Sequence, residues 1–195
     1  MPKAEKLCNN GFSVLKEFME KMLTSCPDHY FQSGPRSSSL KFDFDVEKIE
    51  VEGHEVCGLA DLGQKYGRYK TAHSNVEVYM LENDETTVGV ELPIWLMPHE
   101  IEMYRKFFDC EEPLTGHIDI LRIEDDKIWI WDYKPNAHKE KYADCQTLFY
   151  AIMLSKRTGV SLDKFRCGYF DENTAFVFKP KIEHLEPEEC VAVVR

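Results

Sequence analysis

Two aspartates and a lysine on neighbouring apolar stretches are the residues best suited to chemistry. Asp119 lies within one stretch, and Asp132 and Lys134 stand at the end of the next. Two carboxylates held together repel each other unless a cation lies between them, and a hard divalent metal suits that position. Lys134 follows Asp132 by two residues, so both side chains project from the same strand face. This set suits metal-assisted hydrolysis of a phosphodiester.

A β-hairpin would bring these residues together. Ile118, Ile120 and Leu121 surround Asp119, and an apolar run at 128–131 leads into Asp132. The polar residues 124–127 between the two runs favour a hairpin turn. Pairing of the two strands would place Asp119 and Asp132 close together at one end of a sheet.

Helical and strand patterns alternate along the rest of the chain. The spacing of apolar and turn residues predicts a helix over about 10–25, a loop at 33–39, a strand over Leu40–Val46 that continues at 49–51, a helix within about 66–82, a strand over 86–96, a short helix over about 98–108, a helix over about 139–158 ended by Gly159, and strands near 165–170 and 174–178. Pro93 indicates either an edge strand or a bulge. The order predicts an α/β fold with a mixed central sheet flanked by helices.

The chain has 195 residues, of which 43% are hydrophobic, so it can bury a real core. We expect one domain, with a region of unassigned role at 1–67 and a catalytic core at 68–180. No apolar run reaches 18 residues, which predicts no membrane span, and the N-terminus is not typical of a secretory signal. Seven scattered cysteines without a Cys-x-x-Cys pair favour reduced thiols and a cytoplasmic setting.

The net charge of −11 is unfavourable for a nucleic-acid partner. The charge is unevenly distributed, however, because residues 132–166 hold seven Lys or Arg against four Asp or Glu, a local +3. That balance is compatible with a wall that faces phosphate, and equally with a solvated helix face.

A motif series in this region resembles that of the PD-(D/E)xK nuclease superfamily, and most closely its RecB-like exonuclease branch. The resemblance covers roughly residues 88–178 and is carried by Gly116-x-x-Asp119, Asp132-x-Lys134 and Gln146-x-x-x-Tyr150. It implies a restriction-endonuclease-like fold and a metal-dependent nuclease that acts on DNA, with an exonuclease slightly favoured.

The resemblance also implies roles for the central residues. Asp119 and Asp132 would bind Mg²⁺ or Mn²⁺, with the backbone carbonyl of Tyr133 as a further ligand. Lys134 would position or activate the attacking water and stabilise charge on the phosphate. The alternative for Asp132 and Lys134 is a surface ion pair at a strand end.

Further site residues follow from the family pattern. The family has an acidic residue earlier in the chain, for which we choose Glu91, since a charge within an apolar strand pattern is costly. The alternative is a solvent-facing position on an edge strand. RecB-like members often carry an upstream histidine that binds metal, for which His73 is the candidate. A hydrogen-bonded or exposed histidine is the alternative.

Gln146 and Tyr150 are four residues apart and share a helix face. In the RecB-like branch this pair lies beside the site and contacts substrate or orients catalytic groups. The alternative is an ordinary helical polar residue and a core tyrosine. His117 is expected only to flank Asp119.

Some relatives hold an iron–sulfur cluster with cysteines clustered near the C-terminus. Here Cys167 and Cys190 lie far apart, so no iron–sulfur cluster is predicted. Two other functions remain open: a non-catalytic nucleic-acid-binding or assembly module of the same fold, and a metal-dependent hydrolase of small phosphorylated substrates.

Overall fold

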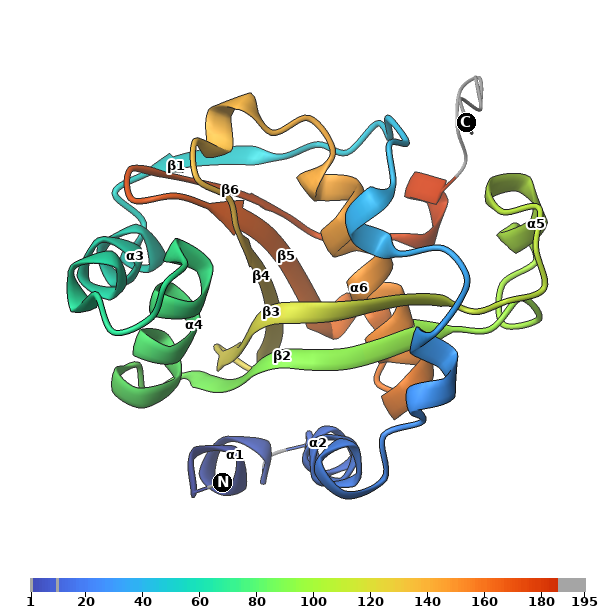
Figure 1. Cartoon of the computed structure of the whole chain (residues 1–195), viewed down its shortest axis with the longest axis horizontal. Coiled ribbons are helices and arrows are strands. Elements are labelled where there is room, and N and C mark those ends of the chain that lie inside the picture. Colours follow the sequence, from blue (N-terminus) through green and yellow to red (C-terminus); the bar gives the residue numbers. More distant parts are fainter. Residues whose placement is uncertain (1, 10, 186–195) are drawn as a thin grey trace.

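The computed structural model describes residues 2–9 and 11–185, and that part of the chain forms one central sheet of six strands. The strand order is β1-β6-β5-β4-β3-β2 (Figure 1). Neighbouring strands are antiparallel except β4 and β5, which are parallel. The strands are β1 (Ile49–Glu52), β2 (Thr87–Leu96), β3 (Leu114–Glu124), β4 (Lys127–Tyr133), β5 (Phe165–Phe170) and β6 (Thr174–Phe178).

Helices cover both faces of this sheet (Figure 1). Ile128 and Ile130 of β4 share a core with the longest helix of the described chain, whereas Trp131 and Tyr133 pack with a helix pair. Side chains alternate along a strand, so these two cores lie on opposite faces. The helices are α1 (Pro2–Cys8), α2 (Ser13–Ser25), the pair α3 (Glu55–Tyr66) and α4 (Ala72–Asn83), α5 (Tyr104–Phe107) and the long α6 (Ala143–Thr158).

Short 3₁₀ turns complete the described structure at Asp28–Phe31, Ser37–Ser39, Ala137–Lys139, Leu162–Lys164 and Ile182–Leu185. Figure 1 shows α1 and α2 beside β2, which ends the sheet. None of the helices in the described ranges is long and apolar enough to cross a membrane. The architecture confirms the predicted α/β class with a mixed central sheet flanked by helices.

β3 and β4 form the predicted hairpin. Its turn residues Asp125 and Asp126 have φ of 51° and 54°, the left-handed values of a type I′ turn. β4 pairs with β3 only between Ile120 and Glu124, whereas β2 pairs with β3 from Leu114 to Arg122. The first half of β3 therefore has an edge that β4 leaves free.

Two expected elements differ from the structure, and some helices were not expected. The predicted strand over Leu40–Val46 is wrong, because this segment is not part of any strand, although Phe44 and Val46 are buried. Alternating apolar residues indicate that one side of an extended segment is buried. Such a segment need not be hydrogen-bonded to a neighbouring strand. The helix expected over about 98–108 is limited to α5, and neither α1 nor α3 was predicted.

Candidate active site

Asp119 and Asp132 face each other at the open end of the β3–β4 hairpin. Ile120 pairs with Trp131, so the next position outward sets Asp119 opposite Asp132. Asp132 is fully buried, and Asp119 is only 9% exposed. Burial raises the pKa of Asp132 well above its ordinary value, and the negative charge of Asp119 raises it further. This pair is a concentration of negative charge that needs a cation nearby.

Lys134 supplies one positive charge to this pair. Its Nζ lies 2.6 Å from Oδ2 of Asp132, and the side chain lines the same pocket as Asp119. Burial opposes the charged form, but the carboxylates of Asp132 and Asp119 outweigh it and raise the pKa of Lys134 above its usual value. Lys134 is therefore an ammonium group, suited to electrostatic stabilisation and unsuited to accepting a proton.

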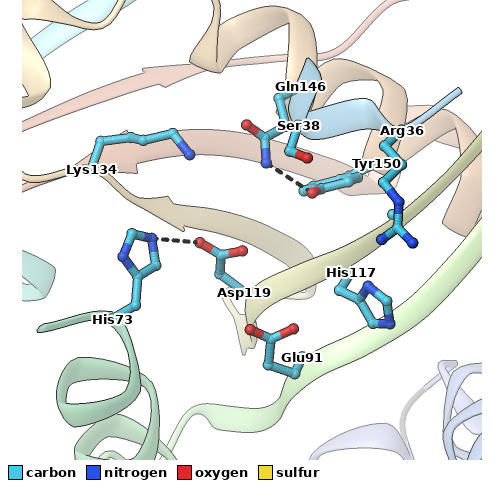
Figure 2. Close-up of a pocket in the computed structure, with 10 residues that line it drawn as sticks. Arg36, Ser38, His73, Glu91, His117, Asp119, Lys134, Gln146 and Tyr150 are labelled. Carbon is cyan, nitrogen blue, oxygen red and sulfur yellow. Dashed lines mark hydrogen bonds and ion pairs between the residues drawn. The ribbon is translucent and has the colours of Figure 1, made fainter. Parts of the chain in front are cut away.

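Gln146 and Tyr150 reach the site from α6. Nε2 of Gln146 donates to Oδ1 of Asp132 at 3.1 Å and to the hydroxyl of Tyr150 at 2.8 Å. Both side chains are buried at one turn's separation on α6 and line the pocket (Figure 2). The amide thus links the aspartate on β4 to the phenol on α6.

Gly116 is required by the close approach of three segments. A Cβ at this position would lie 2.5 Å from Cε1 of Tyr150 and 2.7 Å from Oγ of Ser37. Neither neighbour can move freely, because Ser37 and Tyr150 are both buried. The glycine of the Gly-x-x-Asp motif therefore lets the loop before residue 40 and α6 meet over β3.

Glu91 enters the pocket from β2. Its neighbours Val90 and Leu92 pair with Ile120 and Ile118, so Glu91 lies across from Asp119. Its φ of 49° is a left-handed value that costs a non-glycine residue roughly 1–2 kcal/mol. The side chain is exposed and lines the cavity, as Figure 2 shows.

His73 approaches the pair from α4. Its Nε2 lies 3.5 Å from Oδ2 of Asp119 (Figure 2). Thr71 caps the start of α4 by accepting from the backbone N–H of Ser74, which fixes the first turn on which His73 stands. The structure thus brings together His73, Glu91, Asp119 and Lys134 in one pocket.

Glu77 is a neighbouring acid that the sequence patterns did not single out. It follows His73 by four residues on α4 and is 4% exposed. Burial raises the pKa of Glu77 to about 8, with further increases from Asp119 and Glu91. The signal available in the sequence was a charged residue between the apolar Val76 and Met80, one turn after a candidate histidine.

The raised pKa of Glu77 predicts pH-dependent stability in the metal-free protein. A carboxyl whose pKa is higher in the fold than in the unfolded chain binds more protons when folded. The free energy of unfolding should therefore fall as the pH rises from 4.5 to about 8. Glu77→Gln mimics the neutral form, so it should exceed wild type by about 1–3 kcal/mol at pH 8 and by little at pH 4.5.

Urea denaturation in EDTA at both pH values measures this difference. Glu82→Gln on the same helix is the control, because Glu82 is exposed and its pairing with Arg68 lies on the surface. A stability gain for Glu77→Gln that does not change with pH would contradict the prediction.

The carboxylates of this site fit a divalent cation in chemical type. Oδ2 of Asp119 and Oε1 of Glu77 are buried oxygens without a hydrogen-bond donor among the described residues. In the same residues, no three His, Cys, Asp or Glu side chains already enclose a common point. A closed cage is not required for Mg²⁺, which usually keeps several waters and takes one or two carboxylates.

Tyr133 and His117 complete the account of the motif residues. The side chain of Tyr133 packs on the α3–α4 face, and its hydroxyl donates to Oε1 of Glu172 at 2.6 Å. Only its backbone is thus available next to Asp132. His117 does more than flank Asp119, because it is two residues earlier on β3 and lines the same pocket.

One family of known proteins matches most of this chain. Residues 38–192 match the family model of the PD-(D/E)XK nuclease superfamily. No curated protein matches the chain. A solved structure titled "Crystal structure of SSO0001" is similar with a TM-score of 0.43 and 10% identity, over 89% of this chain and 79% of that one. Because the family model spans most of the sequence, the chain belongs to the PD-(D/E)XK nuclease superfamily.

Proposed function

We propose that this protein is a metal-dependent deoxyribonuclease that hydrolyses DNA phosphodiester bonds, and that it is an exonuclease of the RecB-like branch. One observation carries the proposal: Asp119, Asp132 and Lys134 meet at the end of one hairpin, next to Gln146 and Tyr150. These are the residues of the motif series, and they converge although they come from two strands and a helix. Members of the superfamily typically use Mg²⁺ or Mn²⁺.

In this proposal Asp119 and Asp132 hold the metal ion. Glu91, the backbone carbonyl of Tyr133 and His73 are the further ligands proposed from the family pattern. The ion supplies a water of lowered pKa and neutralises charge on the phosphate. Oε1 of Glu77 is buried without a hydrogen-bond donor among the described residues, and Oδ2 of Asp119 has only the 3.5 Å contact with His73. Both oxygens support a cation at this place, since burial of an uncompensated carboxylate is costly.

Lys134 stabilises the transition state in this scheme. Its raised pKa keeps the amine protonated, so it donates hydrogen bonds to the phosphate oxygens or to the attacking water as charge develops. Its contact with Asp132 fixes the ammonium close to that carboxylate before substrate arrives. A preorganised charge of this kind needs no rearrangement at the moment of reaction.

Gln146 and Tyr150 orient the site and contact substrate. Gln146 donates both of its resolved hydrogen bonds, to Asp132 and to Tyr150, and so fixes the carboxylate rotamer. The Tyr150 oxygen accepts from Gln146, which leaves the phenolic hydrogen to bond a group in the pocket. Burial raises the pKa of Tyr150, so this group remains a neutral donor.

Cleavage of linear DNA in Mn²⁺ tests the proposal. Wild type should cut DNA, EDTA should stop it, and Lys134→Ala should lower the rate by about 10²–10³-fold. Lys134→Arg keeps the positive charge, so it separates lost catalysis from lost folding. Lys127→Ala is the matched control, because Lys127 begins the strand that Lys134 follows and pairs with Glu124 in the turn.

The substrate class is tested in the same assay. An exonuclease should degrade linear DNA and spare covalently closed circles, and RNA and single nucleotides are the comparison substrates. No cleavage of any nucleic acid by wild type, or equal rates for wild type and Lys134→Ala, would falsify the proposed mechanism. Cleavage confined to small phosphorylated compounds would favour the small-substrate hydrolase.

A further inference from the structure

The loop before residue 40 occupies the edge of β3 that β4 leaves free. Arg36 forms an isolated parallel bridge with Thr115, and the backbone N–H of Thr115 donates to Pro35 at 3.0 Å. Oγ of Ser37 donates to the carbonyl of Thr115 at 2.9 Å, and Ser37 is fully buried. A segment far from the motifs in sequence is thus fixed next to Gly116 and the candidate active site.

This attachment turns Arg36 and Ser38 toward the pocket. Ser37 is buried and hydrogen-bonded to β3, whereas its two neighbours are not buried. Both are exposed and line the cavity that also contains Glu91, Asp119 and Lys134. Figure 2 shows the Arg36 guanidinium beside the His117 ring, at the opposite side of the pocket from Lys134 and His73.

Phe31 contacts both Arg36 and His117. Its carbonyl accepts a hydrogen bond from Nη2 of Arg36 at 3.1 Å, and its ring lies 5.2 Å from the ring of His117. An arginine has five N–H donors, so this contact positions the guanidinium and leaves most of its donors available. The guanidinium is therefore positioned at the pocket with donors left to bind an anion.

The charge of Arg36 is also available. Within residues 2–9 and 11–185, no carboxylate lies at ion-pair distance from its guanidinium. Four other arginines do pair with acids: Arg68, Arg105, Arg122 and Arg157. In a chain with 35 acidic and 24 basic residues, a guanidinium that avoids the plentiful carboxylates and lines a pocket points to an anionic ligand.

We propose that Arg36, together with His117 and Ser38, binds a phosphate group of the nucleic-acid strand next to the phosphodiester that is cleaved. The proposal rests on the nuclease function proposed above. A strand would then cross the pocket with one phosphate at Asp119 and Lys134 and its neighbour at Arg36. Guanidinium groups suit this role because they contact phosphate bidentately. Arg36 would then supply a positive charge that helps an acidic chain to hold a polyanion beside the carboxylates.

The phosphate could be an internal phosphodiester or a terminal monophosphate. Binding of short fluorescein-labelled single strands, measured by anisotropy in Ca²⁺, distinguishes them when 5′-phosphorylated and 5′-hydroxyl strands are compared. Strands with one neutral methylphosphonate at each position in turn locate the contacted phosphate. A terminal source predicts a preference for the 5′-phosphate, and an internal source predicts sensitivity at one internal position.

Arg36→Gln should weaken binding by about 10–100-fold and raise KM more than it lowers kcat. It should also be insensitive to the methylphosphonate position that matters in wild type, and the salt slope of log Kd should fall by about 0.7. Arg105→Gln is the control, because Arg105 is exposed on α5, pairs with Glu111 and does not line the pocket. Arg36 is exposed, so the thermal midpoint should not change.

The outcomes separate this proposal from the nuclease proposal. Cleavage by wild type with unchanged binding and an unchanged methylphosphonate profile in Arg36→Gln would overturn the phosphate subsite alone. Arg36-dependent binding without any cleavage would overturn the nuclease and support the subsite. Absence of binding by wild type to every strand would overturn both.

Discussion

Asp119→Asn should lower DNA cleavage by about 10³-fold and at the same time stabilise the metal-free protein by about 1–2 kcal/mol. The loss of activity follows from removing one of the two facing carboxylates proposed to hold the ion. The gain in stability follows from the same charge, because Asp119 raises the pKa of both Asp132 and Glu77. Asparagine keeps the shape of the side chain and removes this repulsion.

Two measurements check this prediction. Urea denaturation at pH 8 in EDTA gives the free energy of unfolding, and thermal midpoints with and without Mn²⁺ give the stabilisation by metal. Wild type should be stabilised by Mn²⁺, and Asp119→Asn should lose most of that gain. Asp125→Asn in the turn of the same hairpin is the control, since Asp125 is exposed and should leave cleavage unchanged.

A metal-free Asp119→Asn protein that is less stable than wild type at pH 8 would contradict the electrostatic argument. Cleavage at the wild-type rate would contradict the role of Asp119. The two readouts are independent, so either part can fail alone. A fall in activity together with a gain in stability distinguishes a functional cluster of charges from a structural one. In a structural cluster, loss of a carboxylate lowers stability.

The centre of the site could be predicted from sequence because local patterns determine it. Period-two alternation and a polar turn place Asp119 opposite Asp132, and a helix ended by Gly159 places Gln146 and Tyr150 together. Gly159 has φ of 72°, as expected of a C-terminal glycine. These signals require only residues close in the chain.

The positions of the residues around this centre, such as Glu77 and Arg36, could not be predicted, because they depend on contacts between segments that are distant in the chain. Helix α3 contains two glycines, which weaken its helical pattern. Gly63 is there for packing, since a Cβ would lie 2.8 Å from Cα of Val76 on α4. The helix within about 66–82 was predicted, but α3 was not, and Glu77 was missed because its burial depends on tertiary packing of α4.

Arg36 illustrates the same limit. Composition around it predicts a loop, and the structure agrees in having only a short 3₁₀ turn there. Its position in the pocket depends on the free edge of β3 and on the fit of Ser37 against Gly116. A single-sequence pattern contains neither piece of information.

Arg122→Met is expected to have the largest effect on folding, a loss of about 3–5 kcal/mol. The guanidinium is fully buried three residues after Asp119 on β3. Its Nε donates to Oδ2 of Asp84 at 2.9 Å and to Oγ1 of Thr86 at 2.8 Å. Asp84 ends α4, so this contact fixes the helix that carries His73 and Glu77 to the strand that carries Asp119.

The loss of stability arises chiefly from Asp84, the buried partner that remains after Arg122 is replaced. Burial opposes the charge of Asp84, but hydrogen bonds from Thr87 and Arg122 hold its pKa below the usual value. Without Arg122 the buried Asp84 carboxylate lacks its cation, and an uncompensated buried charge is more costly than the pair is favourable. A second substitution that removes this charge should therefore restore stability.

The double variant Asp84→Asn/Arg122→Met should recover at least half of the stability lost in Arg122→Met, measured by urea denaturation at pH 7. The pH dependence gives a second check. In Arg122→Met, burial without the cation should raise the pKa of Asp84 above its usual value, so the variant gains stability relative to wild type as the pH falls and the carboxyl takes up a proton. The deficit of Arg122→Met relative to wild type should thus shrink between pH 7 and pH 4, where Asp84 can take up a proton. A deficit that is constant with pH, with no recovery in the double variant, would mean that lost packing of the long arginine side chain, rather than the stranded carboxylate, sets the energetic cost.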